Sequence, residues 1–235
     1  MDYVMDNPID PKRVLSFSVV RVPFFLEPHY DETKPFIESN RERLVKKWGG
    51  KRGWEQQKRR HDLKGRGEAA GIPHFNLDRL ASNSMASHRL IQHVGKRYGL
   101  AMSEHLYDRL NKYYFVDGFA LNDRPRLAKL AAECLESTGT ENAMSQEEVL
   151  AFLNGNGGRQ EILNALDALE RLGVHGIPKF IIEGTTIIDG AAHSDTFVPI
   201  FREIEKRGYI EGGAVFRDIL GIGDDVLKRG SHTRE

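Results

Sequence analysis

The sequence predicts an α/β fold in which a small β-sheet domain is interrupted by an inserted all-helical subdomain. Two observations lead to this prediction. Short runs of β-branched and aromatic residues lie towards the two ends of the chain, within residues 14–26 and 179–188. Between them, from about residue 33 to residue 172, apolar residues recur at helical spacing. Strands at both ends with helices between them indicate a sheet completed from distant segments.

Residues 1–32 are expected to form the N-terminal part of the sheet domain. Val14–Leu26 alternates in polarity, is rich in β-branched and aromatic residues, and closes on a proline-rich turn, so it predicts a strand. Residues 1–11 are acidic and contain prolines, without the apolar core of a secretory signal. No apolar run in the sequence approaches the roughly 18 residues that a membrane span requires.

Residues 33–157 are expected to form the helical insertion. Glycines end several of its periodic stretches, which predict helices over residues 34–48, 53–70, 84–98 and 103–117. Asp123 can cap a further helix that reaches about Ser137, with Pro125 in its first turn. Ser145 and Glu148 have the spacing of a capping box at the start of the last inserted helix.

Residues 158–207 are expected to complete the sheet domain, and residues 208–235 to form a C-terminal tail. Arg159–Leu172 is strongly periodic and predicts a long helix. Lys179–Ile182 and Thr186–Ile188 predict a hairpin, and Ser194–Arg207 predicts an amphipathic helix. In the glycine-rich, charged tail we expect at most a short helix at residues 214–220, with disorder at the very end.

Composition excludes several classes of function. The chain has 235 residues, with 34 basic and 34 acidic side chains and a single cysteine, Cys134. One cysteine allows neither an internal disulfide, nor a Cys-x-x-Cys pair, nor a cysteine-rich zinc site, and it favours a reducing, cytoplasmic location. The neutral balance argues against a protein whose main work is to grip nucleic acid. The nine histidines show no ligand spacing, so we expect no metal site.

The segment Gly173-Val-His-Gly-Ile-Pro178 carries the sharpest local signal in the sequence. A helix ends at glycine there, and a proline stands at the first position of a strand, where proline is tolerated. An ordinary strand can also begin in this way. The Ile177–Pro178 bond is a candidate for a cis peptide bond because it lies in a tight connection between two regular elements.

Four segments in the same order and at similar spacing carry a family resemblance. They are Pro23-Phe-Phe-Leu-Glu-Pro28, Asn83-Ser-Met-Ala-Ser-His-Arg-Leu90, Tyr113–Asp123, and Gly173–Pro178 followed by Phe180 and Asp189-Gly-Ala191. Together they resemble the DsbA-like branch of the thioredoxin superfamily, within it the FrnE-like and hydroxychromene-carboxylate-isomerase-like proteins. The resemblance implies a thioredoxin-like fold split by a helical insertion, and an activity in the thiol–disulfide oxidoreductase class.

The same resemblance also shows what is missing from these residues. Oxidoreductases of the family carry Cys-x-x-Cys at the start of a first helix, after a first strand, where the helix end lowers the pKa of a thiol. Val14–Leu26 matches the family's second strand, and only 13 residues precede it. A strand and a helix need roughly 30 residues. We therefore expect this first unit to be absent and the chain to be inactive as a dithiol enzyme, with no catalytic residue of its own.

By resemblance, the family's cis-proline corresponds to Pro178, and Ile177 before it offers backbone groups to an extended substrate. We expect the substrate-binding residues to be His175, Gly176, Ile177 and Pro178. The expected partners are peptide or protein thiols, or a glutathione-linked small molecule. No cofactor is expected, although glutathione remains open.

Two other classes of function remain open from the sequence. One is a glutathione-dependent isomerase or transferase, in which the thiol of the substrate supplies the chemistry. The other is a non-catalytic module that binds a peptide at the Pro178 loop or an anion at residues 41–68, where eleven Lys and Arg face four Asp and Glu. A solvated helical face also explains such a charge excess. Cys134 is expected to be a packed, unreactive thiol.

Overall fold

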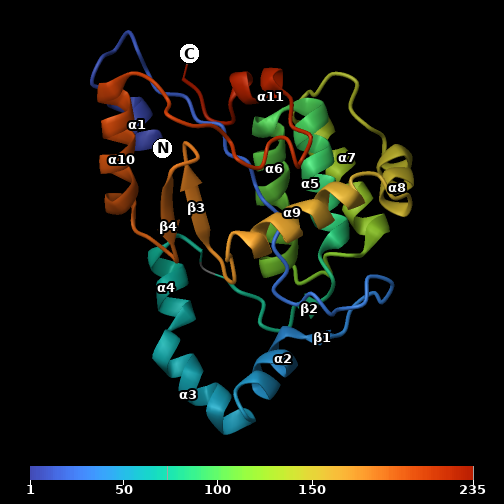
Figure 1. Ribbon diagram of the computed structural model, residues 1–235. Helices are drawn as coiled ribbons and strands as arrows, with labels where there is room; N and C mark the ends of the chain where they lie inside the picture. The colour runs from blue at the N-terminus through green and yellow to red at the C-terminus, as the bar shows by residue number, and fades with distance from the viewer. Residues whose placement is uncertain (73, 235) are drawn as a thin grey trace. The chain divides into compact units, whose positions relative to one another are not determined.

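The protein is described by a computed structural model that covers residues 1–72 and 74–234 (Figure 1). The chain divides into two compact units. The first, called the sheet unit below, contains residues 1–26, 91–104 and 158–235. The second, called the helical unit, contains residues 27–90 and 105–157. Their borders fall inside α5 (Met85–Tyr98) and α6 (Leu100–Asn111), so both helices contribute residues to each unit.

The sheet unit is built around one antiparallel hairpin with helices packed against it. Besides parts of α5 and α6, its elements are α1 (Asp2–Asp6), α9 (Arg159–Arg171), β3 (Lys179–Ile182), β4 (Thr186–Asp189), α10 (Ser194–Arg207) and α11 (Asp224–Arg229). The predicted long helix, hairpin and amphipathic helix are confirmed to within one residue at each end.

The hairpin is stabilised because successive side chains of β3 pack against two separate apolar clusters. Ile181 packs on the α9 cluster, whose buried members are Leu100, Ala165, Ala168, Leu169, Val174, Phe216, Leu220, Ile222 and Val226. Its neighbour Ile182 packs on the α10 cluster of Val4, Phe201 and Ile204. Successive residues of a strand point to opposite faces, so one strand serves both clusters. The turn between the strands uses Gly184 at φ +79°, a backbone conformation that favours glycine.

The predicted strand at Val14–Leu26 is wrong as a member of a sheet. Within this segment a single antiparallel bridge forms, between Phe17 and His232, and no ladder follows it. Two further backbone groups of the segment bond to side chains: the Val19 N–H donates to the hydroxyl of Ser231, and the Arg21 carbonyl accepts from the side chain of Gln92. The apolar residues of the segment nevertheless contribute to the core, because they pack against both apolar clusters of the sheet unit.

The C-terminal residues also differ from expectation. Residues 214–220 form turns rather than a helix, and the short helix of this region is α11 at Asp224–Arg229. The segment is not a loose tail up to residue 234, because four of its apolar side chains are buried in the α9 cluster. These are Phe216, Leu220, Ile222 and Val226.

The helical unit contains a minimal two-stranded ribbon and a series of short helices. Besides parts of α5 and α6, its elements are β1 (Glu38–Ser39), α2 (Asn40–Lys47), α3 (Lys51–His61), α4 (Leu63–Ala69), β2 (Leu80–Ala81), the π-helical turn η1 (Lys112–Val116), α7 (Arg124–Ser137) and α8 (Gln146–Asn154). Strand β1 pairs antiparallel with β2. In Figure 1, α2 and α3 meet in a V and α4 continues from α3.

The side-chain caps decide where several of these helices begin. Asp123 accepts from the N–H of Arg126, and the Ser145–Glu148 capping box forms, so both predicted caps are confirmed. The helix predicted to begin at residue 34 begins only at Asn40, because Ser39 and Glu42 form a capping box of their own.

Two further helical predictions are corrected in detail. The single helix expected over residues 53–70 is two helices, since Asp62 adopts a left-handed conformation and caps the second one. The helix expected over residues 103–117 begins at Leu100 and ends in η1. Within the described residues, no helix is long and apolar enough to cross a membrane.

Candidate functional site

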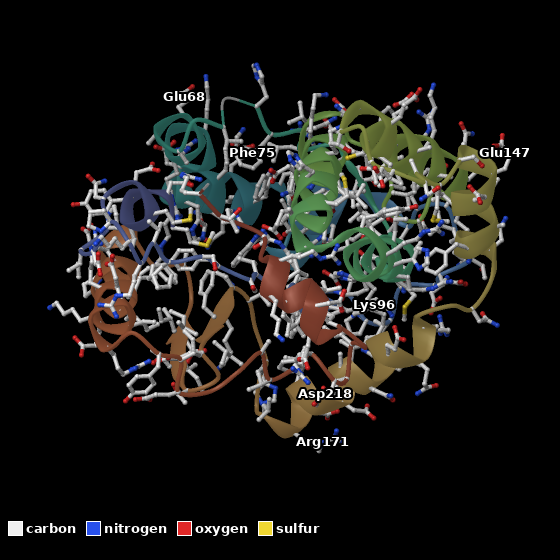
Figure 2. All side chains as sticks on the ribbon, turned by 90° about the horizontal axis from the view of Figure 1, so that it is seen from above. Glu68, Phe75, Lys96, Glu147, Arg171 and Asp218 are labelled. Carbon is white, nitrogen blue, oxygen red and sulfur yellow. The ribbon has the colours of Figure 1, made fainter. Side chains whose placement is uncertain are left out.

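The candidate site is a loop that the end of α9 holds in place. Gly173 follows the helix at φ +67°, its N–H donates to the carbonyl of Glu170, and the N–H of Val174 donates to the carbonyl of Leu169. This pair of bonds is a Schellman motif, which satisfies helix-end carbonyls and normally includes an apolar contact. Val174 and Leu169 supply that contact, as both are buried in the α9 cluster. The loop therefore leaves the helix at a fixed point, just beyond Arg171 (Figure 2).

The four predicted binding residues lie together after this anchor. His175, Gly176, Ile177 and Pro178 are all exposed and line one open hollow of about 290 Å³. The peptide bond between Ile177 and Pro178 is cis. Ile177 is 51% exposed, an unusual state for an isoleucine that stands directly before a strand.

The strand register decides which backbone groups of the loop remain open. Phe180 lies opposite Ile188, and the carbonyl of Pro178 accepts from the N–H of Gly190. In an antiparallel pair, backbone groups turn towards the partner strand at every second residue. Those of Ile177 and Lys179 therefore turn away from β4, and no hydrogen bond to either backbone is recorded within the described part of the chain.

Charges of both signs border the hollow. The ammonium group of Lys179 lies 2.6 Å from a carboxylate oxygen of Asp189, which faces it across the hairpin. Lys179 is largely covered, whereas Asp189 is mostly exposed. The rim thus offers a lysine ammonium group held in place and a carboxylate that a bound ligand can reach.

Sequence reasoning missed half of the residues that line the hollow. They are Gly173, Lys179, Asp189 and Gly190. A signal for them was present, because a hairpin that pairs Phe180 with Ile188 also pairs Lys179 with Asp189. Extending that register by one residue brings Gly190 to Pro178.

Cys134 lies in the helical unit and takes no part in this hollow. It is in α7, 3% exposed, among buried apolar neighbours of the same helix. Burial raises the pKa of the Cys134 thiol, and the nearby Arg109 opposes this only partly. Because the thiolate is the reactive form, the thiol is poorly suited to attack a disulfide.

A second hollow of about 310 Å³ lies in the helical unit, beside η1 and α7. Its charged groups largely satisfy one another: Lys112 pairs with Asp117, and Lys129 with Glu133. Within residues 1–72 and 74–234, no group of three or more His, Cys, Asp or Glu side chains is placed to hold a metal ion.

Comparison with known proteins identifies the family and the fold of the chain. The family model of the DsbA-like thioredoxin domain matches residues 12–201. A solved structure titled a probable DsbA oxidoreductase, from Streptomyces coelicolor, is similar in fold, with a TM-score of 0.62 and 24% identity. The match covers 77% of this chain and 72% of that chain. No curated protein sequence matches. The predicted thioredoxin-like fold with a helical insertion is confirmed.

Proposed function

Because the chain belongs to the DsbA-like thioredoxin-domain family, we propose that its Pro178 loop binds an extended, thiol-bearing peptide while the chain itself performs no dithiol exchange. On this proposal the chain is related to the thiol–disulfide oxidoreductases and binds the same kind of substrate, but it does not catalyse the exchange. The four matching sequence segments further support assignment to the FrnE-like branch.

The observation that carries the proposal is the open backbone edge at the hollow. An extended peptide can add to such an edge by pairing its own N–H and C=O groups with those of Ile177 and Lys179. Its side chains then alternate, and one of them meets the exposed Ile177. Burying that isoleucine contributes roughly 1.5–3 kcal/mol to binding if it becomes fully covered.

The single cysteine in these residues supports the proposed lack of dithiol chemistry. A dithiol exchange needs an accessible thiolate and a second thiol to resolve the mixed disulfide. Cys134 is the single cysteine and is buried, with a raised pKa. Reduction of insulin disulfides by this chain should therefore be no faster than in a blank, and the variant Cys134→Ser should behave identically. Activity that survives this substitution would contradict the proposal.

Binding itself is tested by titrating a ¹⁵N-labelled sample with a cysteine-containing pentapeptide. We expect amide shifts at Gly176, Ile177, Lys179 and Gly190. The variant Ile177→Asp should weaken binding at least tenfold, because it places a charge where the peptide must dehydrate the site. Leu172→Asp is the matched control, since Leu172 is 60% exposed and does not line the hollow. Equal affinities of the two variants would refute a site at the Pro178 loop.

A second candidate ligand is glutathione, favoured by the opposite charges of Lys179 and Asp189 at the rim. Glutathione carries both carboxylates and an ammonium group, so such a rim suits it. Saturable heat of binding for glutathione, with none for the pentapeptide, would favour a glutathione-dependent isomerase or transferase. No heat at millimolar glutathione removes this alternative.

We also propose a reducing, cytoplasmic location. A free, buried thiol as the only cysteine supports it, because proteins of oxidising compartments commonly use cysteines in disulfides. Fractionation of cells that express a tagged chain is the test.

A further inference from the structure

The charges of the chain balance overall but are unevenly distributed. The sequence holds 34 basic and 34 acidic residues, yet residues 41–68 contain eleven Lys and Arg against four Asp and Glu. These residues form α2, α3 and α4 of the helical unit. The neutral total therefore hides a local excess of positive charge, and local charge is what an anionic partner meets.

Ion pairs account for only part of the excess. In α2, Arg41 pairs with Asp78, Arg43 with Glu27, and Lys46 with Glu38. The acidic partners all come from outside residues 41–68. Six further cations are exposed and have no ion pair recorded within the described residues, and Lys47, beside Trp48, is one of them. We call the other five the basic surface: Lys51, Arg52, Arg59, Arg60 and Arg66.

The basic surface lies mainly along one helix. Arg52 and Arg59 are seven residues apart in α3, which places them on the same side, about 10 Å apart along the axis. Trp54, the buried residue of this helix, points to a different side. Lys51 and Arg52 occupy the first turn, where the helix dipole repels cations and no acidic residue offsets them. A bound anion would relieve that repulsion.

An exposed aromatic ring adjoins these cations. Trp48 is 36% exposed, its carbonyl lies against the first turn of α3 at Gly53, and the ammonium group of Lys47 lies 5.8 Å from its ring centroid. The ring of His61, at the end of α3, lies 6.4 Å away. Aromatic rings among cations provide stacking platforms for the bases of single-stranded nucleic acid.

A lipid surface fits the same helices less well. Helices that lie on bilayers insert an exposed apolar face between the headgroups. Trp54 is the large apolar residue of α3, and it is buried. On α4, the exposed Glu68 (Figure 2) lies in the same turn as Arg66 and adds a negative charge that anionic headgroups would repel.

We propose that the basic surface, together with Trp48, binds single-stranded nucleic acid without sequence preference. The cations contact phosphates and the tryptophan ring stacks on one base. This binding activity is independent of the one proposed for the Pro178 loop, because its residues all lie in the helical unit. Oligonucleotides test the first activity and peptides the second.

The test is fluorescence anisotropy of a labelled 12-nucleotide oligo(dT) with the full chain between 50 and 200 mM salt. In the variant Arg52→Gln/Arg59→Gln/Arg60→Gln, the slope of log K against log salt concentration should be smaller in magnitude by about 2. Each lost phosphate contact reduces that slope by about 0.7. Arg171→Gln/Lys206→Gln/Lys228→Gln is the matched control, because it removes the same charge from exposed positions of the sheet unit. Circular dichroism verifies that both variants fold.

Trp48→Ala separates base stacking from simple charge attraction. It should weaken oligonucleotide binding about tenfold, leave binding of inorganic polyphosphate unchanged, and be rescued by Trp48→Phe. Four results would overturn the proposal: no oligonucleotide binding at 100 μM protein in 50 mM salt, equal salt slopes for the two charge variants, no effect of Trp48→Ala, or equally strong competition by polyglutamate or phosphatidylserine vesicles.

Discussion

Arg89 offers the sharpest test of how the helical unit is held together. The side chain is 4% exposed and donates four hydrogen bonds to backbone carbonyls. Its guanidinium group also lies 5.0 Å from the ring centroid of Phe152. The acceptors are the carbonyls of Phe152, Leu153, Gly155 and Gly157, at 2.7–3.2 Å. Two of them belong to the last turn of α8, where helix carbonyls lack partners and the dipole is negative.

We expect Arg89→Met to lower the free energy of unfolding by about 3–5 kcal/mol. A single hydrogen bond to a charged group contributes about 1.5–3 kcal/mol. Four bonds to one guanidinium group overlap in their effect, and removing one partner of a buried charged set typically costs about 3–5 kcal/mol. For a chain of this length the melting temperature should fall by about 6–20 °C. Arg89→Lys should lie between, since a point-like ammonium group cannot reach all four carbonyls.

The assay is urea unfolding followed by circular dichroism, with thermal melts in parallel. Arg97→Met is the control, because Arg97 is an exposed arginine of the same helix and stacks on the adjacent Tyr98. It should change the free energy of unfolding by no more than about 0.5 kcal/mol. If Arg89→Met costs less than about 1 kcal/mol, the reasoning that a buried guanidinium caps α8 is refuted.

Three further predictions concern other parts of the chain. Gly53→Ala should be markedly destabilising in the same urea assay, because a Cβ atom there would lie 1.9 Å from the carbonyl oxygen of Trp48; a loss below about 1 kcal/mol would contradict this. Cys134 should react with dithionitrobenzoate at pH 8 at least about tenfold more slowly in the native state than in urea, because burial raises its pKa; similar rates would disprove the burial. Burial and the hydrogen bond to Glu38 raise the pKa of Tyr30 to about 12, so the folded state holds this proton more tightly than the unfolded state. Stability should fall from pH 10 towards pH 12, and less so in Tyr30→Phe, as urea midpoints will show; parallel pH profiles would count against it.

The sequence predicted helix starts best where a capping side chain hydrogen-bonds to nearby backbone N–H groups. Asp123 and the Ser145–Glu148 pair cap helices as their spacing indicates, because each side chain serves backbone N–H groups within its own turn. The Ser39–Glu42 pair has the same spacing and fixes the start of α2. Reading it would have corrected the helix expected from residue 34.

The extended segment 14–26 could not be predicted as a non-strand from its own residues. Its alternation indicates a strand with one apolar face, whereas Phe17 and Val20 pack on two different clusters. A ladder also needs a neighbouring strand, which is a property of the whole fold. Here the nearest backbone partners come from Ser231 and His232, more than 200 residues away along the chain.

The candidate site shows the same division. The loop from His175 to Pro178 was found from its glycine and proline positions and from family resemblance, whereas its charged rim depends on strand register. The acceptors of Arg89 could not be predicted, because they are backbone carbonyls and carbonyls carry no sequence signature.

The two ends of the sheet unit are tied together, which constrains how the chain can fold during synthesis. Arg234 bonds to Asp2 and Asp6 of α1, and Ser231 bonds to Phe17. Residues 1–26 therefore leave the ribosome long before their partners exist, while the helical unit is already complete at residue 157. At translation rates of about 5–20 residues per second, the N-terminal segment waits roughly 10–40 s for residue 231, with its valines and phenylalanines exposed. A holding chaperone that recognises extended apolar segments is the protection we expect it to need in that interval.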